Sequence, residues 1–443
     1  MNKSIFSFRT FSLLTAFALF PCCFTAQNTN GHYQPTPENL RTREAFRAEK
    51  FGIFIHWGIY STFAQSEWFL QNAHLNREEY AKAAGGFYPA GFNADEWVKA
   101  FKEAGARYVT FTSRHHDGFS MFRTAQSPYN ICDATPFHRD IIGEMSQACH
   151  KQNIPFHIYY SLLDWTRDDY PLGRTGHDTG RTGKSDYNSY FLFMKAQLKE
   201  LLTQYGTIGA IWFDGGWDNP KLNWRLPELY AWIHNIQPAC IIGSNHHLAP
   251  YEGEDFQMFE KDLPGENKSG LNNGVPISKL PLEMCETMND SWGYKATDQN
   301  YKSSAQLIQL LVRAAAKGSN LLLDIGPQPD GQLPQKALER LKDIGKWTSR
   351  YGESLYDTSP TQIPEQTWGV TTQNGKQLFI HIFNSDSINS IQIPLNQKVK
   401  AIESLPTGKA LTYSWKKKSE LCILLPADRD KTLADYVVRV TLR

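Results

Sequence analysis

The chain has 443 residues, of which 41% are hydrophobic and 21% charged, a composition typical of a soluble globular protein. This length exceeds one ordinary domain and suits a large catalytic domain with a smaller one beside it. The formal net charge is +1, or −1 (+1 minus 2) without Lys3 and Arg9 of a removable leader. Neither value predicts a nucleic-acid-binding protein or a polybasic membrane surface.

Residues 1–26 have the pattern of an export signal peptide. A basic start is followed by an apolar stretch over 11–20, too short to cross a bilayer, and then by small residues. We therefore expect an exported protein, periplasmic or extracellular, without a transmembrane segment, and Cys22 and Cys23 are candidate sites for a lipid anchor. The other five cysteines are widely spaced, which predicts neither a disulfide framework nor a zinc cluster.

Eight short apolar runs follow, and amphipathic stretches with helical spacing separate several of them. This alternation is typical of βα units. The apolar runs cover 51–58, 108–118, 155–165, 210–217, 239–245, 256–260, 282–288 and 320–327. The helical stretches include 93–106, 190–206, 304–318 and 335–352, whereas the linkers flanking the sixth and seventh runs look too short or irregular for full helices.

Eight strands predict an α/β fold of the (β/α)8, or TIM-like, barrel type, in which the C-terminal ends of the strands build the active site. A doubly wound open sheet shares the local pattern, but no Gly-rich phosphate-binding sequence follows the first strand, which favours the barrel. After Gly352, short alternating runs predict a C-terminal antiparallel β-sandwich. We expect the barrel domain over 27–352 and the β-sandwich domain over 353–443.

Several reactive or sugar-binding side chains fall at predicted strand ends or in the loops after them. Asp214 ends the fourth run before two glycines, which leaves its carboxylate open to the barrel mouth. It is a candidate nucleophile or general base, with a helix cap as the alternative. The other candidates are His56, Glu67, Trp68, His115 and His116. Rings that cover C–H faces and polar groups that bind hydroxyls suit a sugar ligand.

Two other kinds of site are disfavoured. Adjacent residues of a regular strand, such as His115 and His116, point to opposite faces, and no HxH, HExxH or carboxylate ladder lies nearby. No metal site is therefore predicted. A Ser-His-Asp triad is also disfavoured, because the chain has no GxSxG elbow.

From about residue 36 to the C-terminus, the sequence resembles the retaining α-L-fucosidases of glycoside hydrolase family 29. The resemblance rests on the order of FGIFIHWGIYS (51–61), SEWF (66–69), SRHHDGFSMF (113–122), IWFDGGW (211–217), WGY (292–294) and NLLLDIGPQPDG (320–331). It implies a (β/α)8 barrel with a β-sandwich, no metal or organic cofactor, and fucosylated glycans or oligosaccharides as substrates.

The resemblance also implies the roles of individual residues. Asp214 would be the nucleophile that forms a covalent fucosyl-enzyme, which water releases with retained configuration. Trp292 would be an apolar wall near the C6 methyl group of fucose. The residues implied to bind fucose are His56, His115, His116, Glu67 and Trp68.

Two glutamates compete for the role of general acid/base. A retaining enzyme needs a second carboxyl group about 5–5.5 Å from the nucleophile. Glu266 resembles the position used in the most similar bacterial members and is preferred, while Glu260, at the end of the sixth predicted strand, is the alternative. The chain departs from the family pattern at Asp324, where asparagine usually precedes IGP.

The sequence therefore predicts an exo-acting α-L-fucosidase of broad linkage specificity. The alternatives are a narrow α-1,3/1,4-fucosidase and a fucose-binding protein that has lost catalysis. Retention of Asp214 and of several nearby glutamates disfavours the binding protein.

Overall fold

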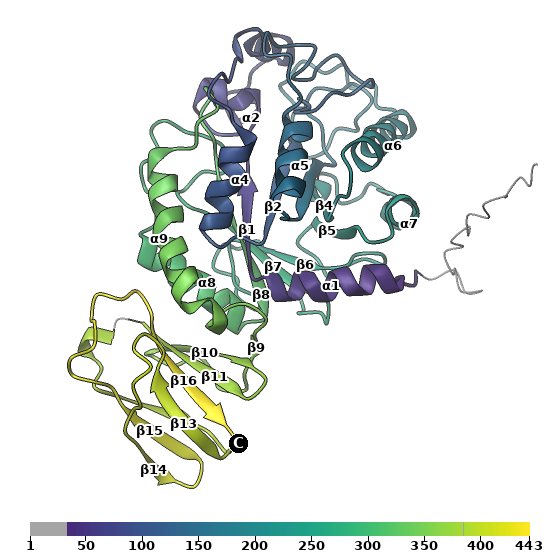
Figure 1. The fold of residues 1–443 in the computed structure, drawn as a ribbon. Helices are drawn as coiled ribbons and strands as arrows, with labels where there is room; N and C mark the ends of the chain where they lie inside the picture. Colours follow the sequence, from purple (N-terminus) through teal and green to yellow (C-terminus); the bar gives the residue numbers. More distant parts are fainter. Residues whose placement is uncertain (1–32, 384) are drawn as a thin grey trace, which may run out of the picture.

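The computed structural model describes residues 33–383 and 385–443. The predicted signal peptide, with Cys22 and Cys23, lies outside these residues. Figure 1 shows a large barrel domain, coloured purple to green, and a smaller yellow-green sheet domain at one end of it. No helix in the described part of the chain is long and apolar enough to cross a membrane.

Eight parallel strands form a nearly closed barrel, as predicted. They are β1 (Phe51–Ile55), β2 (Tyr108–Arg114), β3 (Phe156–Ser161), β4 (Ala210–Asp214), β5 (Ile241–Asn245), β6 (Gln257–Glu260), β7 (Leu282–Thr287) and β8 (Ser319–Ile325). Paired neighbours run in the order β5-β4-β3-β2-β1-β8-β7-β6. At the seam between β5 and β6 the backbone N–H of Asp255 donates to the carbonyl of Ile242 at 2.6 Å.

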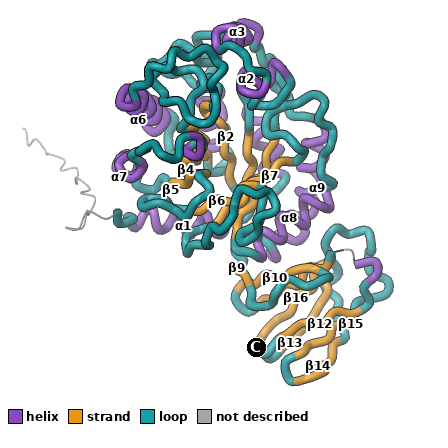
Figure 2. The backbone as a smooth tube through the Cα atoms, turned by 180° about the vertical axis from the view of Figure 1, so that it is seen from behind, coloured by secondary structure: helices purple, strands orange, loops and turns teal. Residues whose placement is uncertain are grey.

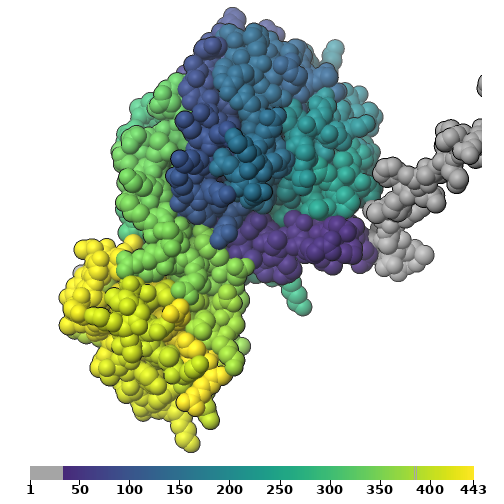
Figure 3. All heavy atoms as spheres, viewed as in Figure 1, coloured from purple at the N-terminus to yellow at the C-terminus, as the bar shows by residue number. Residues whose placement is uncertain are grey.

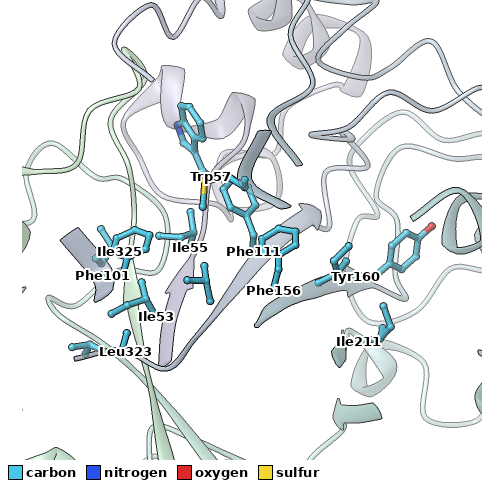
Figure 4. Close-up of a cluster of buried hydrophobic side chains, with 14 of the residues drawn as sticks. Ile53, Ile55, Trp57, Phe101, Phe111, Phe156, Tyr160, Ile211, Leu323 and Ile325 are labelled. Carbon is cyan, nitrogen blue, oxygen red and sulfur yellow. The ribbon is translucent and has the colours of Figure 1, made fainter. Parts of the chain in front are cut away.

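Both faces of the barrel strands are buried, which explains why the runs are almost continuously apolar. Alternate residues point outward against the helices, and Figure 4 shows part of this layer around Ile53, Ile55 and Phe111. The other set points into the barrel, where Phe54 and Trp212 pack together. The inward rings form an apolar layer below the barrel mouth.

Helices cover the outside of the barrel. They are α4 (Ala94–Glu103), α5 (Ile141–Lys151), α6 (Tyr187–Gln204), α7 (Leu226–Ile236), α8 (Ser304–Ala316) and α9 (Gln335–Tyr351). The first helix, α1 (Pro37–Glu49), instead lies across the N-terminal end of the barrel, where Phe46 packs with the inward-facing rings of Phe54 and Tyr108. The side chains of Asn93, Asp140, Asp186 and Ser303 cap the starts of α4, α5, α6 and α8. Within 246–281, a segment that the structure describes throughout, loops replace helices, as the irregular linkers indicated.

Loops and short helices gather at the C-terminal ends of the strands. The short helices α2 (Phe69–Asn72) and α3 (Arg77–Ala81) follow β1. Figure 2 shows them with long teal loops at one end of the barrel, opposite the sheet domain. This end is where a (β/α)8 barrel carries its active site.

The C-terminal domain is the predicted antiparallel sandwich. One sheet has the order β13-β16-β11-β10-β9 and the other β12-β15-β14. Their bounds are β9 (Ser359–Pro360), β10 (Gly369–Asn374), β11 (Gln377–Ile382), β12 (Ser390–Pro394), β13 (Val399–Ser404), β14 (Tyr413–Lys417), β15 (Glu420–Leu424) and β16 (Tyr436–Leu442). Ile380, Ile391 and Val438 belong to one buried cluster that the two sheets enclose.

The sandwich packs on the barrel through α8. The side-chain amide of Gln309 donates to the carbonyl of Ala434 at 2.9 Å, and Arg313 pairs with Glu365 at 3.0 Å. Gly318, just before β8, packs closely against Pro360. The sandwich therefore lies at the N-terminal ends of the strands, and Figure 3 shows it as a lobe beside the green helices. Because α9 ends at Tyr351, the predicted boundary at 352/353 falls directly after this helix.

Candidate active site

A cavity of about 320 Å³ opens at the C-terminal ends of the barrel strands, and it is here called the sugar cavity after the ligand that the sequence predicts. Eight of the nine predicted site residues line it, and they come from strand ends and loops far apart in the chain. They are His56, Glu67, Trp68, His115, His116, Asp214, Glu260 and Trp292. Glu266 does not line the cavity, and its carboxylate, 25% exposed, pairs with the Lys268 ammonium at 2.6 Å.

Asp214 presents its carboxylate to the sugar cavity with donors on both oxygens. The Tyr159 hydroxyl donates to Oδ2 at 2.9 Å, and the Trp217 indole N–H donates to Oδ1 at 3.0 Å. Gly215 follows with φ 88°, and a Cβ there would lie 3.0 Å from the backbone nitrogen of Leu163. The glycine therefore permits the sharp turn after β4, and the donors fix a carboxylate that stays open on one side.

Asn245 hydrogen-bonds to Asp214 and to a second carboxyl group, that of Glu260. Its Nδ2 lies 3.3 Å from Oδ1 of Asp214 and 2.8 Å from Oε2 of Glu260, across the seam between β5 and β6. Burial, followed by repulsion from the Asp214 carboxylate, raises the pKa of Glu260 to about 7. Within the cavity, one carboxyl group is thus held by donors while its neighbour favours the protonated form.

The hydrogen bond to Ser161 fixes the tautomer of His116, with the proton on Nδ1. The Ser161 hydroxyl donates to the carbonyl of Leu163 at 2.7 Å, so it accepts from Nδ1 of His116, also at 2.7 Å. Burial lowers the pKa of His116, which favours the neutral ring. Its Nε2, 3.5 Å from Oδ2 of Asp214, therefore carries no proton in the neutral ring and can accept a hydrogen bond.

The pKa values of the other two histidines shift in opposite directions. Nδ1 of His56 lies 2.7 Å from Oδ1 of Asp324. Burial opposes the positive charge of His56, but the carboxylates of Asp324, Glu67 and Asp214 together outweigh burial and raise its pKa. Burial, together with the neighbouring histidines, holds the pKa of His115 well below its usual range. The departure from the family pattern at residue 324 therefore places a charged partner on one of the predicted fucose-binding rings.

Aromatic side chains form the walls of the cavity. Trp292 lies 5.2 Å from His56 and 6.1 Å from Phe54, measured between ring centroids. On the opposite side Trp68 stacks on Trp217 at 5.8 Å. Such rings suit the C–H faces and the methyl group of a deoxysugar better than they suit a highly charged ligand.

Glu67 fixes the position of one wall. Its Oε2 accepts the backbone N–H of Gly293 at 2.7 Å and the hydroxyl of Ser66. This links the loop after β1 to the loop that carries Trp292. In residues 33–383 and 385–443, no group of three or more side chains is arranged to hold a metal ion.

Comparison with known proteins agrees with this geometry. A family model described as alpha-L-fucosidase matches residues 22–353. The chain belongs to this family. It is 30% identical to the tissue alpha-L-fucosidase of Homo sapiens over 436 residues, which cover 89% of this chain and 88% of that protein.

Solved fucosidase structures have the same architecture. Alpha-L-fucosidase isoenzyme 1 from Paenibacillus thiaminolyticus is 32% identical, with a TM-score of 0.81, and covers 92% of this chain and 100% of its own. A family 29 alpha-L-fucosidase from Bacteroides thetaiotaomicron is 26% identical, with a TM-score of 0.80, and covers 94% and 98%. This chain is therefore a glycoside hydrolase of the fucosidase class, with a barrel and a sandwich.

Sequence reasoning missed several residues of the fucosidase site. Tyr159 lies in the middle of β3, where a tyrosine cannot be told from core. Asn245 closes the fifth predicted strand, and the rule that selected Asp214 could have found it. Arg174 and His247 also line the cavity, from the loops after β3 and β5.

Proposed function

We propose that this fucosidase is a retaining exo-enzyme that removes terminal α-L-fucose, with Asp214 as nucleophile and Glu260 as general acid/base. The observation that carries the proposal is the shared Asn245 amide. Its two hydrogen bonds, 3.3 and 2.8 Å long, place the facing oxygens of Asp214 and Glu260 at most 6.1 Å apart. Retaining glycosidases separate their carboxyl groups by about 5–5.5 Å, whereas inverting ones leave more room for water.

In the first step Asp214 attacks the anomeric carbon of fucose, and the bond from that carbon to the leaving oxygen breaks. Glu260 gives its proton to that oxygen. In the second step Glu260 takes a proton from water, the water oxygen bonds to the anomeric carbon, and Asp214 leaves as a carboxylate. Each step inverts the anomeric carbon, so the released fucose retains the α configuration.

The charges in the cavity support this change of role. While Asp214 is ionised, its repulsion helps to keep Glu260 protonated, as an acid must be. Esterification of Asp214 removes that charge, which lowers the pKa of Glu260 and favours the base that the second step requires. His247, whose Nε2 lies 3.7 Å from Glu260, does not supply a compensating charge, because burial lowers its pKa.

Trapping the intermediate tests the proposal. The Bacteroides fucosidase structure contains a covalent intermediate trapped with 2-fluoro-fucosyl fluoride in a Glu-to-Gln mutant of that protein. The same reagent is expected to add one fluorofucosyl group to the peptide that contains Asp214 here, as mass spectrometry would show. Proton NMR of early hydrolysis should detect α-fucose first. Initial release of β-fucose would rule out the retaining mechanism.

The pH dependence of kcat/KM provides a second prediction. Glu260 must carry a proton, so activity is present below its pKa of about 7 and is lost as the pH rises through that value. Above it, kcat/KM for an oligosaccharide should fall about tenfold per pH unit. Glu260→Gln is expected to remove this alkaline limb, and Glu266→Gln to keep it. An unchanged limb in Glu260→Gln would argue against Glu260.

The wider functional predictions remain part of this proposal. We infer an exported enzyme of broad linkage specificity that acts on α-1,2, α-1,3, α-1,4 and α-1,6 fucosides. Hydrolysis limited to α-1,3 and α-1,4 linkages would support the narrow alternative. A fucose-binding protein without catalysis is disfavoured, because both carboxyl groups of a glycosidase lie in one cavity.

A further inference from the structure

A second and larger cavity, here called the side cavity, adjoins the sugar cavity. Its volume is about 680 Å³, and it lies between the loop after β4 (residues 216–227) and the loop after β5 (residues 246–252). Arg174, Trp217 and His247 line both cavities. The two cavities therefore share a boundary.

The walls of the side cavity are unusually apolar for an exposed surface. Leu248 is 54% exposed and Tyr251 is 41% exposed, and Trp217 and Trp224 line the same space. The ring centroids of Tyr251 and His246 lie 4.5 Å apart, so His246 packs against the Tyr251 ring and helps to hold it in place. Soluble proteins rarely gather exposed apolar side chains in a hollow unless a ligand or partner covers them.

The loops that form the side cavity are held in shape. Arg225 and His247 have positive φ values of 54° and 60°, a backbone conformation that costs energy in residues other than glycine. The Trp224 indole donates to the carbonyl of Asn219 at 3.1 Å, and His246 bonds to Glu254 at 3.0 Å. The cavity is thus preformed in this structure.

Most charges around the side cavity are already neutralised. The Arg225 guanidinium makes two hydrogen bonds to the Glu228 carboxylate, at 2.7 and 2.9 Å. The cavity lining also carries one negative charge on Glu252 and one positive charge on Arg174, which balance. Arg174 differs, because its guanidinium makes no hydrogen bond or ion pair with the described residues. This balance suits a neutral ligand with hydroxyl groups.

Arg174 is nevertheless fixed through its backbone. Oδ1 of the buried Asp218 accepts the N–H groups of Arg174 and Thr175 at 3.0 and 2.8 Å, and Oδ2 accepts the hydroxyl of Tyr170 at 2.7 Å. The N–H of Arg174 also donates to the carbonyl of Asp218 at 2.9 Å. These hydrogen bonds to Asp218 therefore hold the backbone of Arg174 at the boundary between the two cavities. The five N–H donors of its guanidinium are unused there.

We propose that the side cavity binds the sugar residues attached to fucose. Its volume is more than twice that of the sugar cavity, which takes one fucose, so it accommodates two further pyranose rings. Tyr251 stacks on a ring, and Arg174 donates to hydroxyls of the sugar next to fucose. The inference rests on the proposed function and specifies its substrate class: neutral oligosaccharides with at least two sugars beyond fucose.

The test compares kcat/KM for a neutral fucosylated trisaccharide with kcat/KM for an aryl α-L-fucoside. The ratio of these two values in wild type is the reference, because the leaving groups differ in reactivity. Tyr251→Ala should lower the ratio of the two values about fivefold, the loss expected for one stacking contact, and Tyr251→Phe should restore it. Tyr413→Ala is the matched control, because Tyr413 is 39% exposed on β14 of the sandwich. Its ratio should equal that of wild type.

The possible failures can be told apart. A ratio that Tyr251→Ala leaves unchanged would overturn the role of the side cavity while fucosidase activity stands. A wild type that hydrolyses neither substrate would overturn the proposed function, and this inference with it. A drop in Tyr413→Ala equal to that in Tyr251→Ala would show an effect unrelated to the cavity.

Discussion

Asp214→Ala is expected to lower kcat for a chromogenic α-L-fucoside by about 10⁴-fold, the scale seen when a covalent nucleophile is removed. Alanine cannot bond to the anomeric carbon, and Glu260, the second carboxyl group to which Asn245 hydrogen-bonds, has its own role. Release of nitrophenol by wild type and variant, both in chelator, measures the effect. If the enzyme depended on a metal ion, the wild type itself would lose activity in chelator.

The loss of the nucleophile in Asp214→Ala must be distinguished from a loss of folding stability. Removing the carboxylate leaves the buried Tyr159 hydroxyl and the Trp217 indole without their acceptor, which costs about 1–3 kcal/mol for each donor left unpaired. Asp214→Asn keeps an oxygen for one of these donors and is the better-folded comparison. Both variants should unfold cooperatively yet lack turnover. Full activity in either one would place the active site elsewhere.

The barrel could be predicted because its strands are buried on both faces. Parallel strands under helices are apolar along their whole length, so the eight runs stand out from the amphipathic stretches between them. The rule that functional residues close such strands then selected His56 and Asp214. Tyr159 escaped this rule because it bonds to Asp214 from the middle of β3.

Pairings between distant segments could not be read from the sequence. His56 meets Asp324 only because β1 and β8, from opposite ends of the barrel domain, lie side by side in register. Sequence alone showed an unusual aspartate but not its partner. Only the structure shows that this residue hydrogen-bonds to His56 and helps to raise its pKa.

The choice between Glu260 and Glu266 shows the same limit. Resemblance to other members favoured Glu266, which lies in a loop six residues after Glu260, the last residue of β6. The seam of the barrel, where β5 and β6 lack a regular ladder, brings Asn245 and Glu260 together. Glu266 instead pairs with Lys268 outside the lining of the sugar cavity. No pattern of residue types encodes which glutamate lies beside that seam.

Glu260→Ala should lower kcat/KM for a natural fucosylated oligosaccharide by about 10²- to 10⁴-fold, because the leaving sugar oxygen needs a proton. An aryl fucoside with an acidic leaving group needs less help, so its first step should be less affected and the fucosyl-enzyme should accumulate. Azide needs no general base. It is expected to restore turnover of the aryl fucoside and to yield fucosyl azide of the α configuration, which NMR identifies.

Glu266→Ala is the matched control, since it removes a partly exposed carboxylate six residues away. It should hydrolyse both substrates nearly as wild type does and should not respond to azide. Rescue of Glu266→Ala, with none for Glu260→Ala, would transfer the acid/base role to Glu266. Because Glu266 lies outside the cavity lining, that result would also require residues 261–280 to move when substrate binds. Azide rescue therefore decides both the identity of the acid and whether this loop acts as a closing element.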